Sequence, residues 1–229
     1  MSYSKERAIV YVDGFNLYFG LRASTINRKN IKRLPKRVYW LDIQKLAETL
    51  VQGRQLVCVK YFTARIKGNP DKQNRQNTFL NALQIQCHKL QMIEGRYLFR
   101  EVFCMRCRTI SSDIICSKCG NVNHLPEEKK SDVNIATQMV KDAYENNFDV
   151  AYLISGDSDL VPPIEVIRAM TPPKRVIVVF PPNRGGSKEL KNTADFVLYL
   201  SARDIKNSLL PDEIEKQDGT KLTIPEHWK

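Results

Sequence analysis

Short apolar runs, each ended by polar or turn residues, recur along the chain and predict the strands of an α/β fold. The run over residues 8–12 is continuously apolar and stops at Asp13 and Gly14, as a parallel strand buried on both faces would. Further runs predict strands over residues 56–63, 97–103, 150–154, 175–180 and 196–200.

Apolar residues at helical spacing predict helices between these strands. The expected helices span residues 17–22, 41–50, 78–90, 133–144 and 160–170, with a further helix after residue 201. The polar residues 65–77 predict a connection. Because strands and helices alternate, we expect a doubly wound, mainly parallel sheet. In such a sheet, functional groups collect beyond the carboxyl ends of the strands.

Length, composition and charge narrow the class of protein. The 229 residues are 42% hydrophobic and 27% charged, which suits one α/β domain with a small insertion. No apolar run approaches the roughly 20 residues that span a bilayer, and residues 1–7 lack the apolar core of a signal peptide. We therefore expect a cytoplasmic protein without a membrane partner. The net charge of +11 favours a polyanion, although charge alone does not identify which one.

Four aspartates are expected at the carboxyl edge of the sheet. Asp13 follows one buried strand, Asp157 and Asp159 follow another, and Asp132 lies at the start of a predicted helix. Two carboxylates 4 Å apart repel by about 4 kcal/mol at an effective dielectric of 20, so the cluster requires protonation, separation or a cation. Hard oxygen ligands favour Mg²⁺ or Mn²⁺. Singly, each aspartate could be a turn or helix-capping residue; together they predict a metal site.

Three motifs around these aspartates resemble the NYN domains of the PIN-like nuclease superfamily. They are Val12-Asp13-Gly14-Phe15-Asn16, Lys130-Ser131-Asp132-Val133, and Leu153-Ile154-Ser155-Gly156-Asp157-Ser158-Asp159-Leu160. The likeness covers about residues 7–200 and is strongest to a subgroup that is widespread in bacteria. It implies a parallel α/β sheet and an acidic magnesium or manganese cluster that cuts RNA. The residues that would carry it are Asp13, Asp132, Asp157 and Asp159, with Asn16 as the polar residue beside the first aspartate.

The motifs therefore predict a metal-dependent nuclease, most simply an endoribonuclease in which an activated water attacks the phosphodiester and leaves a 5'-phosphate. Asn16 would orient a ligand or phosphate, or cap a helix, and Ser155 would hydrogen-bond in the site or serve the turn. The alternative is a catalytically silent RNA-binding or adaptor protein that keeps the cluster. A haloacid dehalogenase phosphatase is disfavoured because Phe15 stands where a second aspartate is needed. A serine hydrolase is disfavoured because the chain lacks a G-x-S-x-G elbow.

Four cysteines form two C-x-x-C pairs within sixteen residues. Cys104 and Cys107 form one pair and Cys116 and Cys119 the other, a spacing that resembles the knuckles of a zinc ribbon. Four thiolates make a closed tetrahedral site, so we expect structural zinc. The remaining two, Cys58 and Cys87, are expected to be buried.

The predicted organisation is a NYN/PIN-like nuclease domain over residues 1–200, a zinc-binding module inserted at 98–124, and a C-terminal helix and tail over 201–229. Basic residues concentrate in three connections, which are candidate phosphate contacts or solvated loops: residues 28–37, 65–75 and 184–191. Four aromatic residues near the first of these could stack bases or pack in the core, namely Tyr18, Phe19, Tyr39 and Trp40.

Overall fold

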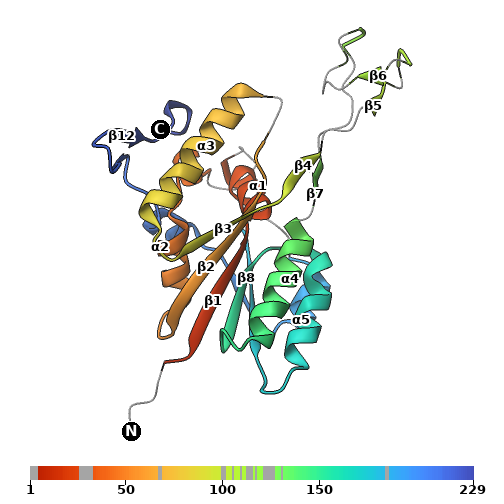
Figure 1. Cartoon of the computed structure of the whole chain (residues 1–229), viewed down its shortest axis with the longest axis vertical. Helices are drawn as coiled ribbons and strands as arrows, with labels where there is room; N and C mark the ends of the chain where they lie inside the picture. The colour runs from red at the N-terminus through yellow and green to blue at the C-terminus, as the bar shows by residue number, and fades with distance from the viewer. Residues whose placement is uncertain are drawn as a thin grey trace.

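A parallel sheet forms the centre of the molecule (Figure 1). The computed structural model describes residues 5–25, 33–66, 69–98, 131–183 and 186–229, with shorter pieces at 102–104, 106–108, 110–111, 116, 118–120 and 127–129. Within these residues, the sheet has six strands in the order β10-β9-β8-β1-β2-β3. The strands are β1 (Arg7–Asp13), β2 (Gln55–Thr63), β3 (Leu90–Glu94), β8 (Val150–Ile154), β9 (Arg175–Phe180) and β10 (Phe196–Tyr199).

The direction in which the chain adds strands reverses at β1. From β1 the chain adds β2 and β3 on one side, and then returns to add β8, β9 and β10 on the other. All neighbouring strands are parallel. The carboxyl ends of β1 and β8 therefore lie side by side, with Val12 paired to Ile154. Ligands bind at such a switch point in open α/β sheets. The predicted doubly wound, PIN-like α/β fold is confirmed.

Helices cover both faces of the sheet. Alternate residues of β1 point to opposite faces, so Val10 packs into one core and Tyr11 into the other. The first core lies under α1 (Gly14–Thr25), α2 (Ile43–Leu50), α3 (Pro70–Gln86) and α7 (Ala202–Asn207). The second lies under α4 (Ser131–Tyr144), α5 (Val161–Arg168) and α6 (Lys188–Thr193). No helix among the described residues has the length and apolar character needed to cross a membrane.

The outer edge of the sheet differs from the prediction. The third strand was expected over residues 97–103, but β3 is Leu90–Glu94 and begins at the last residue of the helix expected over 78–90. Helix α3 begins at Pro70, inside the expected connection. The side chain of Asn69 caps it by accepting the backbone N–H of Lys72 at 3.0 Å, and proline suits the first helical position. None of residues 70–77 is buried, so the polar composition of this first part of the helix gave no helical pattern, and only the part from residue 78 was predicted.

The segment between β3 and α4 leaves the sheet and returns to it. An antiparallel pair links it to the main domain, formed by β4 (Arg96–Leu98) and β7 (Glu127–Lys129). A second short pair, β5 (Val102–Phe103) with β6 (Ile110–Ser111), lies within the segment (Figure 1). Of the residues expected to form one sheet strand, 97–98 belong to the first pair and 102–103 to the second, and 99–101 lie outside the described residues.

The C-terminal segment was expected to be a helix followed by an irregular tail, but it is ordered throughout. After α7, the strands β11 (Glu213–Glu215) and β12 (Lys221–Thr223) form a hairpin, and a 3-10 turn, η3 (Glu226–Trp228), ends the chain. Ile214, Ile224 and Trp228 join the core beneath α1 to α3. The ring of Trp228 lies 5.6 Å from that of Tyr39 and 6.4 Å from that of Trp40. This segment therefore completes one of the two cores.

A buried ion pair and its hydrogen bonds join the neighbouring strands β1 and β2 to α4. The Nζ of Lys60 lies 2.6 Å from Oδ2 of Asp142, and the phenol of Tyr11 donates to the same oxygen at 2.7 Å. Lys60 also donates to Gln138 at 3.0 Å, and Asn147 donates to the other oxygen of Asp142 at 3.1 Å. Tyr11 and Lys60 are partners in the register of β1 and β2. The network therefore fixes α4 against the two strands.

Replacing Lys60 by methionine is expected to lower the free energy of unfolding by about 3–5 kcal/mol, because Asp142 stays buried without its cation. Urea denaturation measures the change. The matched control is Lys221→Met, which removes an exposed pair with Glu213 in the hairpin and should leave the midpoint nearly unchanged. Equal midpoints for the two variants would contradict a structural role for the buried pair.

Candidate active site

Asp13 lies at the junction of β1 and α1 and is only 6% exposed. Its Oδ1 accepts the backbone N–H of Asn16 at 2.9 Å, which caps the first turn of α1. Its Oδ2 accepts a hydrogen bond from the hydroxyl of Ser155 at 2.9 Å. Burial raises the pKa of Asp13 to about 6; the two hydrogen bonds oppose the shift, and the charges of Asp132 and Asp157 add to it.

Asn16 and Ser155 connect the end of β1 to the loop that follows β8. The side-chain oxygen of Asn16 accepts the backbone N–H of Gly156 at 3.2 Å. The hydroxyl of Ser155 donates to Asp13 and accepts the N–H of Asp157 at 3.2 Å, so it bridges the two strand ends. Asn16 therefore does not cap α1, because Asp13 has that role. Ser155 serves both the turn and the site, two roles that sequence reasoning had treated as alternatives.

The other three aspartates surround this junction. Asp157 caps the 3-10 turn η2 (Ser158–Leu160) by accepting the N–H of Asp159 at 3.1 Å. Asp132 lies in the first turn of α4. Burial raises the pKa of Asp132, and the negative charges of Asp157 and Asp159 raise it further. The four predicted aspartates thus lie close enough for their charges to interact at one edge of the sheet.

The acidic group suits a hydrated divalent cation. Among the described residues, these aspartates do not form a group of three carboxylates that could hold a metal ion directly, whereas the four cysteines do form such a group. Mg²⁺ usually keeps several waters and binds through one or two carboxylates together with substrate phosphates, so a dry cage is not required. The raised pKa values of Asp13 and Asp132 reflect repulsion and burial that a cation would offset. The donor type and the charge therefore fit Mg²⁺ or Mn²⁺.

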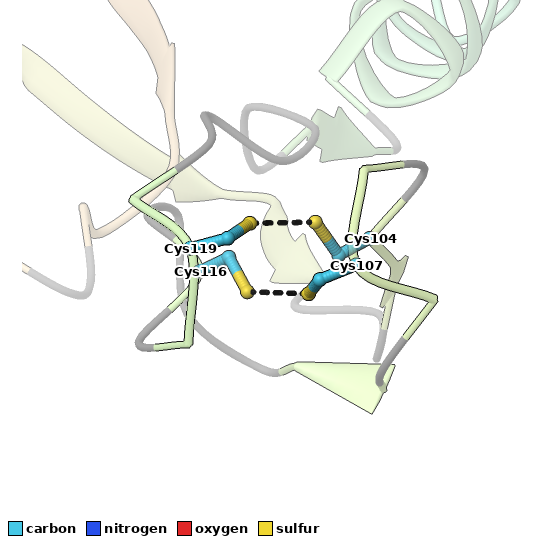
Figure 2. A group of neighbouring side chains, drawn as sticks. All are labelled: Cys104, Cys107, Cys116 and Cys119. Atoms are coloured by element: carbon cyan, nitrogen blue, oxygen red, sulfur yellow. Dashed lines mark hydrogen bonds between the residues drawn. The ribbon is translucent and has the colours of Figure 1, made fainter.

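The four cysteines of the insertion face one another (Figure 2). The Sγ atoms of Cys104 and Cys119 lie 3.5 Å apart, those of Cys107 and Cys116 lie 3.4 Å apart, and all four fall within 4.8 Å. Sulfurs bound to tetrahedral zinc at 2.3 Å are about 3.7 Å apart, so the spacing fits the ion. A backbone hydrogen bond from Cys119 lowers the pKa of Cys116 to about 6, and one from Cys107 lowers that of Cys104. Both shifts favour the thiolate form that binds metal.

The other predicted residues divide between the core and the surface. Residues 28–32, 67–68 and 184–185 of the basic segments lie outside the described residues, as does Lys130. Arg65 forms an ion pair with Glu94 at 2.8 Å. Trp40 is fully buried, whereas Tyr18 and Phe19 are exposed. Cys87 is buried as expected, but Cys58 is only half-buried.

Sequence reasoning missed the steric role of Gly14. A Cβ atom at this position would lie 2.6 Å from the carbonyl oxygen of Phe62 and 2.7 Å from the ring of Tyr61. Glycine therefore lets α1 begin against the end of β2, directly after Asp13. The Asp-Gly-Phe-Asn motif was the available signal, but nothing in it shows the close approach.

The variant Gly14→Ala is expected to lower the free energy of unfolding by about 1–3 kcal/mol through overpacking. It should also speed hydrogen exchange at the backbone amides of Asn16 and Gly156, because displacement of α1 disturbs both hydrogen bonds. Hydrogen exchange read by NMR measures this. The control Gly53→Ala meets no atom within 4 Å but strains a residue with φ of 83°, so it tests general destabilisation. Equal protection of these amides in both variants would argue against a local role for Gly14.

Comparison with known proteins identifies the family. The family model described as NYN domain matches residues 7–201, which is most of the chain. The chain belongs to the NYN domain family. Membership places it in a nuclease-like family whose substrates are nucleic acids, and the resemblance seen in the three aspartate motifs is confirmed.

Two individual proteins are similar to this NYN domain protein. It is 27% identical over 249 residues to 6-hydroxy-3-succinoylpyridine 3-monooxygenase HspA of Pseudomonas putida, with 97% of this chain and 75% of that protein covered. A crystal structure of a protein of unknown function from Vibrio parahaemolyticus has a TM-score of 0.54 and 21% identity, with 92% of this chain and 99% of that chain covered. The second likeness shows a shared fold alone.

Proposed function

We propose that this NYN domain protein is a metal-dependent endoribonuclease that hydrolyses RNA phosphodiesters at the edge formed by β1 and β8. The observation that carries the proposal is the group of four interacting aspartates at the switch point of the sheet, Asp13, Asp132, Asp157 and Asp159. Ordinary capping explains one oxygen each of Asp13 and Asp157, but it does not explain why four carboxylates from three elements, β1, α4 and η2, converge. Membership of a nuclease-like family supports a phosphodiester as the bond that is cut.

The four aspartates would hold Mg²⁺ or Mn²⁺, which when bound lowers the pKa of an attacking water and offsets charge on the phosphate. The protein contributes a fixed arrangement of carboxylates. Asp13 is held by Asn16 and Ser155, whereas Asp132 and Asp159 are exposed and therefore accessible to a phosphate. The net charge of +11 attracts the RNA over long range and counteracts local repulsion by the acidic group.

Asp157→Asn is expected to reduce cleavage by on the order of 10²-fold or more, since loss of a ligand should exceed the roughly 10–100-fold cost of changing an outer-shell residue. End-labelled single-stranded RNA is incubated with manganese, magnesium or EDTA, and the products are tested for 5'-phosphate ends. The matched control is Glu145→Gln, which neutralises an exposed carboxylate beyond the far end of α4. It should cleave like the unaltered protein.

The same variant separates the nuclease from a silent RNA-binding or adaptor protein. RNA binding by Asp157→Asn should be retained or strengthened, because the change removes one negative charge near the phosphates. If the unaltered protein binds RNA but cuts it with none of the metals, the silent binder replaces the nuclease.

The Pseudomonas putida relative is named as a monooxygenase, which is a different class of enzyme from a nuclease. An identity of 27% leaves room for a different substrate on the same scaffold, since function depends on the site and not on the fold. The acidic cluster, with its excess of negative charge, supports cation and phosphate chemistry here.

We also propose that the cysteine group binds one structural zinc ion. All four positions of tetrahedral zinc would be taken by Cys104, Cys107, Cys116 and Cys119, which leaves none for substrate. The ion would order the module at 98–124, which lies within the NYN domain of 1–200. The segment 201–229 is then the C-terminal support of that domain. A cytoplasmic location, where thiols stay reduced, is part of the same proposal.

The double variant Cys104→Ser/Cys116→Ser is expected to lose its zinc, because two thiolates cannot form the tetrahedral site. Metal analysis by mass spectrometry should fall from one zinc per chain to near zero. Unfolding of the main domain in urea should change little, because neither cysteine belongs to the two cores of the sheet. The control Cys58→Ser removes a half-buried thiol elsewhere and should keep its zinc. Zinc retained by the double variant would contradict the assignment.

A further inference from the structure

Three aromatic side chains follow the acidic site along α1. Phe15 comes two residues after Asp13, and Tyr18 and Phe19 lie one turn further on. The ring centroids of Phe15 and Phe19 are 6.4 Å apart, and those of Tyr18 and Phe19 are 5.5 Å apart. The three rings therefore form one continuous group, which we name the aromatic strip.

The aromatic strip is not explained by packing of α1 on the sheet. Leu17 and Leu21 are the buried apolar residues of α1 in the core. The ring of Tyr18 lies 5.4 Å from that of Tyr39, yet Tyr18 and Phe19 are each 40% exposed. Burying an aromatic ring contributes about 1.5–3 kcal/mol, and the nearby Trp40 is fully buried. The fold thus buries one neighbouring aromatic residue completely and leaves much of two others in contact with water.

Positive charge lies beside the aromatic strip. Arg22 is exposed one turn beyond Tyr18 on α1, and Arg75 lies on α3. Burial raises the pKa of Tyr18, while both arginines act on its phenol in the opposite direction, which puts their charges close to the ring. Aromatic rings next to cations form the combination that binds single-stranded nucleic acids, by base stacking and phosphate contacts respectively.

We propose that the aromatic strip is a base-stacking subsite for unpaired nucleotides next to the phosphate held at the acidic site. The proposal rests on the nuclease function for the position of that phosphate. From Phe15 to Phe19 the helix rises about 6 Å, which corresponds to one or two nucleotide steps of 3.4 Å. Arg22 and Arg75 would meet the flanking phosphates. Paired bases are already stacked within a duplex, so the subsite makes the enzyme prefer single strands.

The first test measures binding without cleavage. Fluorescence anisotropy with a labelled 12-nucleotide single-stranded RNA, in EDTA at fixed salt, should show that Tyr18→Ala/Phe19→Ala raises Kd by at least about 5-fold. Tyr18→Trp should retain affinity, because it keeps a stacking surface. Tyr144→Ala is the matched control: Tyr144 is 84% exposed at the opposite end of α4 from Asp132, and its loss should change nothing. Urea midpoints of all variants confirm folding.

The second test separates bases from backbone. An oligonucleotide of the same length without bases should bind the unaltered protein and the double variant equally, because it offers nothing to stack. If the double variant lost affinity equally for the intact and the abasic strand, stacking would be contradicted. An unchanged Kd of the double variant for intact RNA would also contradict it. If the unaltered protein cuts RNA and the double variant binds RNA with an unchanged Kd, the subsite proposal is wrong and the nuclease proposal is retained. If the unaltered protein does not cut RNA but the double variant binds RNA more weakly, the nuclease proposal is wrong and the stacking subsite is retained.

Discussion

The burial of the Asp13 carboxylate where β1 meets α1 is the constraint on which the site depends. A carboxylate removed from water needs hydrogen bonds, and here they come from α1 and from the loop after β8. These two bonds satisfy Asp13, and the one from Ser155 also joins the ends of the neighbouring strands β1 and β8. Ser155 holds Asp157 as well, so one hydroxyl fixes the relative position of two members of the acidic group.

Support for the fourth aspartate comes from a different part of the sheet. Asp132 is exposed at the start of α4, and no strand carries it. Its position depends on how α4 lies across β1 and β2, which the buried pair of Lys60 and Asp142 fixes together with Tyr11. A charge pair needs a defined geometry to offset the loss of water, so it specifies the helix position more narrowly than apolar contacts alone would. The position of Asp132 at the acidic edge therefore depends on this interior network.

The electrostatics of the protein change sign with distance. Over the whole chain the net charge is +11, which favours the approach of a polyanion. At the edge of β1 and β8 the sign reverses, and a phosphate can settle there only with a cation. Binding at the proposed aromatic strip would depend on neither the positive net charge nor the acidic group, because the stacking of bases on aromatic rings does not require a net charge. The net charge would then attract the RNA, stacking would position its bases, and the acidic group with its cation would act on the phosphate.

The sequence by itself determined what local patterns encode. Buried strands at 150–154 and 175–180 were predicted with their observed bounds, because a parallel strand covered on both faces is a continuous apolar run. The two cysteine pairs between Cys104 and Cys119 and each single aspartate motif were also recognisable, because each is a short pattern along the chain. Only the tertiary structure decided that β3 replaces the expected third strand, that Lys60 meets Asp142, and that Ser155 bridges to Asp13. Those features depend on partners that are distant in sequence, and no local pattern records which partner a side chain will meet.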